Sequence, residues 1–208
     1  MKLRIASLSF LLICLAGVPA VADTIYNNGP INGTTDAWTV NFGFVVSDTF
    51  TIPAGGGTIT GLNFGAWMFP GDDIHIGDVF ITSSEFGGTT YFDGTINFTV
   101  SDCSTNQYGY SVCTESGRLG PVNLAGGTYW LSLENFEDVG DPLYWDENSG
   151  PSQASENTIG TIPSEAFTLL GTSSTTTTSS TSVPEPNSVM LFGSGILGLA
   201  GMLRRRWL

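Results

Sequence analysis

Short stretches in which apolar and polar residues alternate dominate the chain, with the two-residue period expected of strands that bury one face. The first runs over positions 40–52, and its apolar face consists of Val40, Phe42, Phe44, Val46, Phe50 and Ile52. Further apolar faces consist of Leu62, Phe64, Ala66 and Met68, of Ile96, Phe98 and Val100, and of Tyr129, Leu131 and Leu133. No long amphipathic helix is indicated between positions 23 and 171, so we expect an all-β domain.

Glycine or proline clusters separate these stretches, at positions 55–57, 70–73, 87–88 and 126–127. Many short strands joined by tight turns are typical of two packed antiparallel sheets. We therefore predict an antiparallel β-sandwich, jelly-roll-like, over residues 23–171. In the run from Ile74 to Ile81 the parity of the apolar positions shifts near Gly77, which predicts a β-bulge there.

The N-terminus has the layout of a secretory signal peptide. Basic residues at Lys2 and Arg4 precede an apolar run over positions 5–18, and Ala-Val-Ala follows at 20–22. We therefore expect export and removal of residues 1–22.

Removal of the signal peptide also removes Cys14 and leaves two cysteines, Cys103 and Cys113. An even number of cysteines in an exported chain predicts a disulfide. Closing so short a loop would stabilise the fold by about 3 kcal/mol on the chain-entropy estimate. The alternative is a pair of unbonded buried thiols.

The predicted domain is strongly acidic. Between Asp23 and Val183 the only basic residue is Arg118, whereas all 19 acidic residues except Glu185 lie there. Such a charge repels phosphate backbones, so nucleic acid is excluded as a partner. The acids are dispersed among apolar alternations, which favours a folded acidic surface over a disordered acidic tail.

The chain after the domain divides into two segments. Positions 172–183 are almost entirely Thr and Ser, a composition that predicts a linker and offers sites for O-glycosylation. Pro-Glu-Pro follows at 184–186, then an apolar stretch over 188–203 and three arginines at 204–206. The apolar stretch is short for a membrane span, but the arginines behind it are typical of a cytoplasmic stop, so we predict a single transmembrane helix.

The order, spacing and terminal position of these features over residues 184–208 resemble the PEP-CTERM sorting signal. The resemblance implies recognition by an exosortase-type transpeptidase in the inner membrane and cleavage near Pro-Glu-Pro. It also implies delivery to the cell surface or the exopolysaccharide matrix of a Gram-negative bacterium. The residues it assigns to sorting are Pro184, Glu185 and Pro186 for recognition, and Arg204, Arg205 and Arg206 for retention on the cytoplasmic side.

The sequence gives little support for catalysis. A Ser or Cys triad needs a histidine, and the only one is His75, which lies between Ile74 and Ile76 in a predicted strand. Zinc binding lacks ligands for the same reason. Acidic residues are so abundant that a carboxylate pair of the glycosidase kind is expected by chance alone. We therefore expect a protein without enzymatic activity.

Acidic and aromatic residues are most concentrated at positions 137–148. The candidate ligand residues there are Asp138, Asp141, Tyr144, Trp145, Asp146 and Asn148. The oxygens of Asp138, Asp141, Asp146 and Asn148 suit calcium, the one candidate cofactor, although the spacing is not that of an EF-hand. The two aromatic rings could stack on a sugar. The alternatives are a polar surface loop and aromatic residues that pack in the core.

These observations predict an exported component of the cell surface or extracellular matrix, with a structural or interaction role. An alternative function is a carbohydrate-binding module that retains extracellular polysaccharide. A glycoside-active enzyme is a third hypothesis, and it would require two carboxylates that converge in a cleft.

Overall fold

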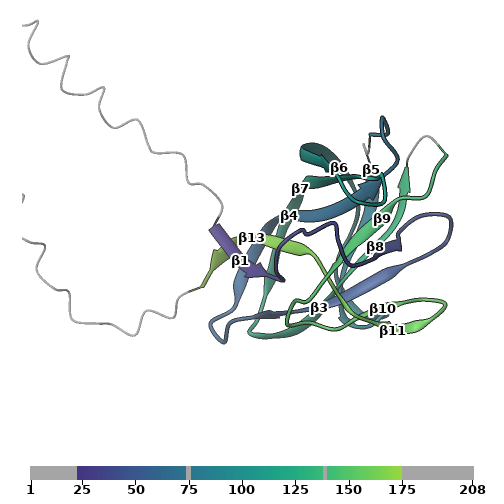
Figure 1. The fold of residues 1–208 in the computed structure, drawn as a ribbon. Coiled ribbons are helices and arrows are strands. Elements are labelled where there is room, and N and C mark those ends of the chain that lie inside the picture. Colours follow the sequence, from purple (N-terminus) through teal and green to yellow (C-terminus); the bar gives the residue numbers. More distant parts are fainter. Residues whose placement is uncertain (1–22, 74–75, 138–139, 175–208) are drawn as a thin grey trace, which may run out of the picture. The chain divides into compact units, whose positions relative to one another are not determined.

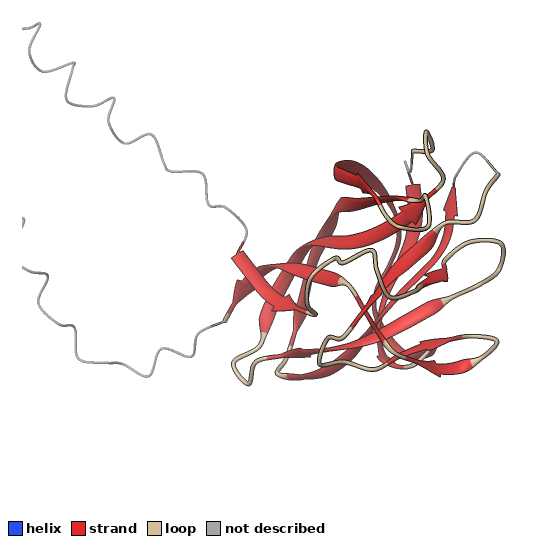
Figure 2. Cartoon of the chain, in the orientation of Figure 1, coloured by secondary structure: helices blue, strands red, loops and turns tan. Residues whose placement is uncertain are grey.

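A computed structural model describes residues 23–73, 76–137 and 140–174, and every regular element in them is a strand (Figure 2). The predicted signal peptide, the sorting residues and the predicted membrane span lie outside the described residues. Among the described residues, no helix is present that could cross a membrane.

Thirteen strands make up the described part of the chain. They are β1 (Asp23–Asn27), β2 (Ala37–Thr39), β3 (Val46–Ile52), β4 (Gly57–Met68), β5 (Ile76–Ser84), β6 (Gly87–Thr105), β7 (Ser111–Leu124), β8 (Gly127–Glu137), β9 (Tyr144–Asn148), β10 (Ala154–Glu156), β11 (Gly160–Ile162), β12 (Ser164–Glu165) and β13 (Phe167–Ser173). β13 therefore includes Thr172 and Ser173, the first two residues of the predicted linker.

Hydrogen bonds join the strands into one antiparallel sheet in the order β1-β13-β4-β7-β6-β5-β8-β3-β10-β11, and β9 connects β2 and β12 to β4. The long strand β6 belongs to both halves of this sheet. It pairs with β5 as far as Asn97 and with β7 from Phe98 onward. The sheet consequently curls into a half-barrel (Figure 1). The predicted all-β, antiparallel class is confirmed.

The core lies on the inner face of the curled sheet. Three of the predicted apolar faces point into it, and Phe64, Leu131 and Leu133 are completely buried there. The bulge predicted at Gly77 is also confirmed, because the pairing of β5 with β8 shifts register between Ile76 and Asp78. A Cβ at Gly77 would lie 2.5 Å from the ring of Phe136, so the bulge also allows a close packing contact.

The strand predicted over positions 40–52 is wrong in its first half. β3 begins only at Val46, and residues 41–44 form a turn closed by a hydrogen bond from Phe44 N to Asn41 O (3.1 Å). Phe42 has a positive φ of 57° and is 63% exposed, so it lies outside the core. The side chain of Asn41 explains the turn, since it is buried and bonds the backbone of Asp141 (3.0 Å).

The predicted disulfide is confirmed. Cys103 in β6 and Cys113 in β7 are bonded, next to a register shift between Ser101 and Ser104 in the pairing of these strands. The bond therefore fastens the hairpin where its hydrogen-bond ladder is irregular.

Candidate functional site

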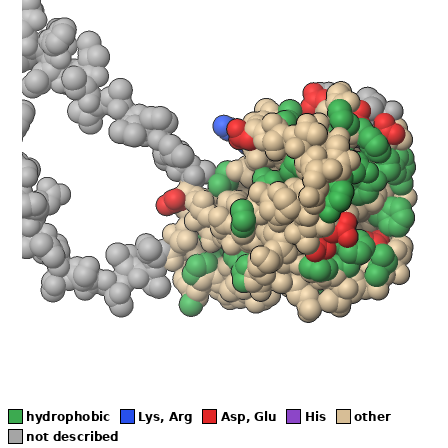
Figure 3. All heavy atoms as spheres, viewed as in Figure 1, with side chains coloured by type: hydrophobic (Ala, Val, Ile, Leu, Met, Phe, Trp, Pro, Cys, Tyr) green, Lys and Arg blue, Asp and Glu red, His purple; other side chains and the backbone are tan. Residues whose placement is uncertain are grey.

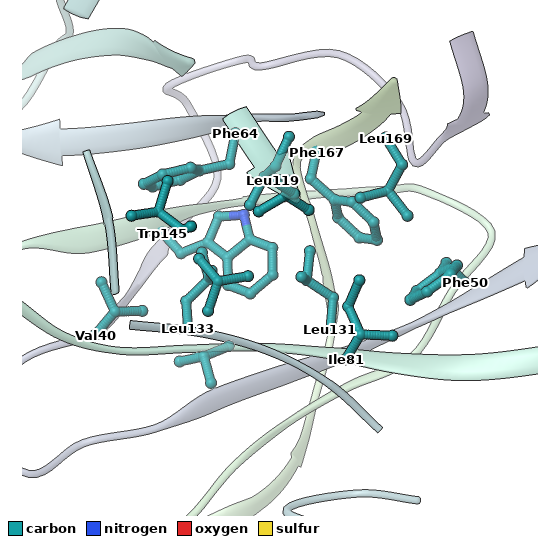
Figure 4. Packing of buried hydrophobic residues seen from close by; sticks show 14 of the residues in the cluster. Val40, Phe50, Phe64, Ile81, Leu119, Leu131, Leu133, Trp145, Phe167 and Leu169 are labelled. Carbon is teal, nitrogen blue, oxygen red and sulfur yellow. The ribbon is translucent and has the colours of Figure 1, made fainter. Parts of the chain in front are cut away.

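The predicted ligand residues do not form a surface loop, because Tyr144–Asn148 is strand β9, paired with β2, β4 and β12. Alternation along this strand separates its two aromatic residues. Trp145 is completely buried between Phe64 and Phe167, as Figure 4 shows, and its Nε1 donates to Ala166 O (3.0 Å). The ring of Trp145 is therefore not available to stack on a sugar, and the prediction of an exposed loop is wrong here.

Asp146 is buried and serves as a structural acceptor. Its Oδ1 accepts hydrogen bonds from Trp67 Nε1 (2.6 Å) and Gly33 N (3.0 Å), and its Oδ2 accepts one from Asn32 N (2.7 Å). Burial raises the pKa of this carboxyl, although these three donors act in the opposite direction. Asp146 thus ties the loop around Asn32 to β4, where Gly65 has no side chain to obstruct the approach.

Asn148 is also occupied within the fold. Its Nδ2 donates to Asn28 O (2.8 Å), and its Oδ1 accepts from Gly150 N (2.8 Å) and Ser164 Oγ (3.0 Å). Asp141 lies in the loop before β9, whereas Asp138 is outside the described residues. In the described ranges, no group of three or more His, Cys, Asp or Glu side chains is arranged to hold a metal ion.

Tyr144 points to the opposite side of β9 from Trp145 and joins a group of aromatic residues near the surface. This aromatic surface cluster consists of Trp67, Phe69, Tyr108, Tyr110 and Tyr144. Tyr108 stacks on Trp67 (ring centroids 5.8 Å apart), and Tyr110 contacts Phe69 (5.1 Å) and Tyr144 (5.6 Å). Tyr108 is 57% exposed and Phe69 is 39% exposed, whereas Trp67 below them is only 4% exposed.

The turn that carries Tyr108 and Tyr110 is held by its own hydrogen bonds. Asn106 Oδ1 accepts from the backbone N of Tyr108 and of Tyr110 (3.0 Å each), and Gly109 adopts a positive φ of 88°. The disulfide described above lies at the base of the same hairpin. The backbone of the turn that carries these rings is consequently restrained.

A second group of polar residues, Asn28, Asp48 and Glu165, is buried. Asn28 Nδ2 donates to Asp48 Oδ2 (3.0 Å) and to Glu165 O (2.7 Å), and Glu165 N also donates to Asp48 Oδ2 (2.8 Å). Burial raises the pKa of Asp48 to about 6 and that of Glu165 well above its usual value, with Asp48 adding to the latter. Within the described ranges, neither carboxyl oxygen of Glu165 has a hydrogen-bond partner. These acids are enclosed in the fold and stabilise it best when protonated.

Two acids line a groove of about 380 Å³ on the outer face of β5, β6 and β8. They are Asp93 and Glu134, and burial, followed by Asp78 and Asp93, raises the pKa of Glu134. The middle strand β5 separates them, since Asp93 pairs with Phe80 and Glu134 with Asp78. The exposed face in Figure 3 likewise shows acidic side chains scattered among hydrophobic ones.

Comparison with known proteins identifies the other end of the chain. Residues 182–206 match the PEP-CTERM protein-sorting motif. The chain ends in a PEP-CTERM sorting signal. No curated protein and no solved structure matches the chain. The motif implies a protein that is exported, processed by an exosortase and displayed at the surface of a Gram-negative bacterium.

The matched range contains the residues to which the sequence assigns sorting, Pro184 to Pro186 and Arg204 to Arg206. Their individual roles stay predictions. The PEP-CTERM match covers only this tail, so it says nothing of what the half-barrel binds.

Sequence reasoning missed four members of the aromatic surface cluster: Trp67, Phe69, Tyr108 and Tyr110. A signal for two of them was present, because Asn106-Gln-Tyr-Gly-Tyr110 places two aromatic residues in a turn-forming segment between predicted strands. Aromatic side chains in a turn cannot follow the alternation that buries them in a core.

Proposed function

We propose that the half-barrel is a non-catalytic component of the cell surface or matrix that binds extracellular polysaccharide through the aromatic surface cluster. The observation that carries this proposal is the exposure of Tyr108 and Phe69 above the buried ring of Trp67. Exposed apolar patches on soluble domains mark interaction sites. The C–H face of a sugar ring packs well on the negative face of an aromatic ring, whose hydroxyl can also bond the sugar.

The rigidity of the aromatic surface cluster supports a role for its exposed rings in binding. Trp67 is fixed by its hydrogen bond to Asp146, and Asn106 fixes the turn that carries Tyr108. Rings that are already ordered lose little conformational entropy when a ligand binds, so more of the contact energy contributes to affinity.

The strand order supports the jelly-roll-like sandwich that the sequence predicts, which we include in this proposal. One side of the half-barrel runs β1-β13-β4-β7 and the other runs β3-β8-β5-β6. Each of these two runs holds four strands, with connections that cross between the sides, as in jelly rolls. Lectin domains use this architecture, although a fold alone does not establish a function.

We further propose that an exosortase-type transpeptidase recognises Pro184, Glu185 and Pro186, while Arg204, Arg205 and Arg206 hold the tail on the cytoplasmic side. The motif match over 182–206 supports this assignment.

The binding proposal is tested with the full-length chain purified in mild detergent. Retardation in gels that contain the host's extracellular polysaccharide is compared between the wild type and a Tyr108→Ala, Phe69→Ala variant. We expect at least a tenfold loss of affinity. The matched control is Tyr91→Ala, which removes a 42% exposed aromatic residue outside the cluster.

Equal retardation of the cluster variant and the wild type would show that these rings contact something else, such as another protein of the matrix. Release of reducing ends by the wild type, abolished in Glu134→Gln, would instead support the glycosidase hypothesis.

A further inference from the structure

A second groove opens where β6 and β7 part. β6 pairs with β7 from Phe98, opposite Gly117, to Thr105. Before Phe98, β6 pairs with β5 instead, whereas β7 pairs with β4 on both sides of Gly117. The divergence leaves a groove of about 940 Å³, which we call the polar groove.

Half of the residues that line the polar groove have neutral polar side chains. Its hydroxyl and amide groups come from Thr60, Asn63, Thr95, Asn97, Thr99 and Ser116. Ile96 and Leu119 add an apolar floor, and Arg118 contributes the one positive charge. None of the described residues that line the groove is acidic, although acids are abundant elsewhere in the domain.

Arg118 is the only Lys or Arg among the described residues. Its side chain is exposed, and it forms no ion pair with any carboxylate of the described ranges. A lone guanidinium in so acidic a domain would be expected to attract a neighbouring carboxylate. Its place in a groove without acids therefore leaves its five donors available to a ligand.

The polar groove and the aromatic surface cluster share two strands. Arg118 pairs with Gly61, and Val112 pairs with Trp67, so six residues along β7 separate the two sites. At the rise of a β-strand this separation is about 20 Å. Trp67, Asn63 and Ser116 alternate with the core residues of these strands, so they lie on the outer face of the sheet. One extended saccharide could contact both sites.

We propose that the polar groove binds an acidic sugar residue of the polysaccharide, with the carboxylate held by the Arg118 guanidinium. This inference rests on the proposed function, since it takes the ligand to be a polysaccharide. A guanidinium and a carboxylate form two parallel charge-assisted hydrogen bonds, which gives direction as well as affinity. The surrounding hydroxyl and amide groups bond the sugar hydroxyls. No described lining residue is acidic, although the lining residue Thr95 donates through its Oγ1 to Asp78 Oδ1 (2.6 Å).

Acids farther from the groove repel a charged polysaccharide at long range. At about 0.15 M salt the screening length is about 8 Å, so distant acids are screened while direct contact with Arg118 is not. The binding experiment is therefore done at this ionic strength.

The test compares polygalacturonate with its carboxyl-reduced form, which has the same backbone without the charge. With the full-length chain, we expect the wild type to bind the acidic form at least tenfold more tightly. Arg118→Gln should bind the two forms equally, and Arg118→Lys should keep a reduced preference because it loses the paired geometry. The matched control is Gln153→Glu, an exposed position outside the groove where the net charge changes by the same amount.

Four outcomes separate this inference from the proposed function. A preference for the acidic form that survives in Arg118→Gln overturns the inference, as does a wild type without any preference. Loss of both forms in Tyr108→Ala, Phe69→Ala supports the proposed function whatever Arg118→Gln does. Loss of the preference in Arg118→Gln, combined with wild-type binding by the aromatic variant, supports the groove and overturns the part of the proposed function that assigns polysaccharide binding to the aromatic surface cluster.

Discussion

Glu115 is an acidic residue that lies in an apolar environment. It lies in β7 on the face that points into the core, opposite Phe64, and it is completely buried. Neither of its carboxyl oxygens has a hydrogen-bond partner among the residues that the structure describes. Burial, with a smaller contribution from Asp73, raises its pKa to about 8. Glu115 is therefore mostly protonated in the folded protein at neutral pH.

This shift predicts a pH-dependent stability. In the unfolded chain the pKa of Glu115 is near 4.5, so between about 4.5 and 8 the folded state holds a proton that the unfolded state releases. The stability that the Glu115 proton contributes is fully present below about pH 4.5 and is lost as the pH rises through about 8. The loss is at most about 1.4 kcal/mol per pH unit. Glu115→Gln should thus raise the free energy of unfolding at pH 8 and leave it nearly unchanged at pH 4.5.

Urea unfolding of both proteins at the two pH values checks this expectation. Asp48 and Glu165 also have raised pKa values, so some pH dependence should persist in the variant. An equal effect of Glu115→Gln at both pH values would mean that the carboxyl does not titrate as described.

Asp146 links the core to the aromatic surface cluster through Trp67. In Asp146→Asn, an amide N–H₂ replaces one of the two oxygens that now accept from Trp67, Gly33 and Asn32. At least one buried donor loses its partner, which costs about 1–3 kcal/mol of stability. We expect a lower unfolding midpoint, altered near-ultraviolet circular dichroism of Trp67, and weaker polysaccharide binding. Asp36→Asn, an exposed acid at the end of the same loop, is the control.

At the scale of elements, the hairpin between β6 and β7 depends on its disulfide. Cys103 and Cys113 enclose the turn that carries Tyr108 and Tyr110. Replacing both cysteines by serine should lower the free energy of unfolding by about 3 kcal/mol, because the unfolded chain gains freedom. The same variant should bind polysaccharide less tightly, since the turn is less restrained. Chemical denaturation without reductant measures the first effect, and an unchanged midpoint would contradict it.

The sequence predicts the strands whose inner faces alternate regularly, such as Leu62 to Met68, because burial of one face fixes their period. It fails at β9, since the polar residues of that strand are satisfied by partners distant in sequence. Asp146 bonds Asn32 and Gly33, and Asn148 bonds Asn28. Local composition indicates a polar loop there, and only the tertiary contacts make a buried strand possible.

The sequence predicts the candidate site only in part, as it does the strands. Tyr144 was identified from its acidic and aromatic neighbours, but its partners are Trp67, which pairs with it from β4, and Tyr110 in the turn before β7. No short-range pattern brings Trp67 and Tyr108 together, because the pairing of β4 with β7 creates that contact.

At the scale of the whole molecule, we expect the half-barrel and the PEP-CTERM tail to perform separable tasks. A variant with Pro184→Ala and Pro186→Ala should keep the polysaccharide binding of the half-barrel but lose processing in a host with the sorting enzyme. Intact mass of the surface protein measures processing, with a strain that lacks the transpeptidase as the reference. A chain that ends at Leu208 in both strains would contradict cleavage and indicate a simple membrane anchor.

The first and last strands of the half-barrel lie side by side. β1 pairs with β13, and β13 also pairs with β4, so β13 fills the space between two earlier strands (Figure 1). An exported chain that emerges from its N-terminus onward presents β1 and β4 long before β13 is outside. Until then an edge of β4 is open to pairing with other chains. The yield of folded protein therefore depends on how quickly the last strand follows the others across the membrane, and a delay in translocation favours aggregation even when the finished sheet is stable.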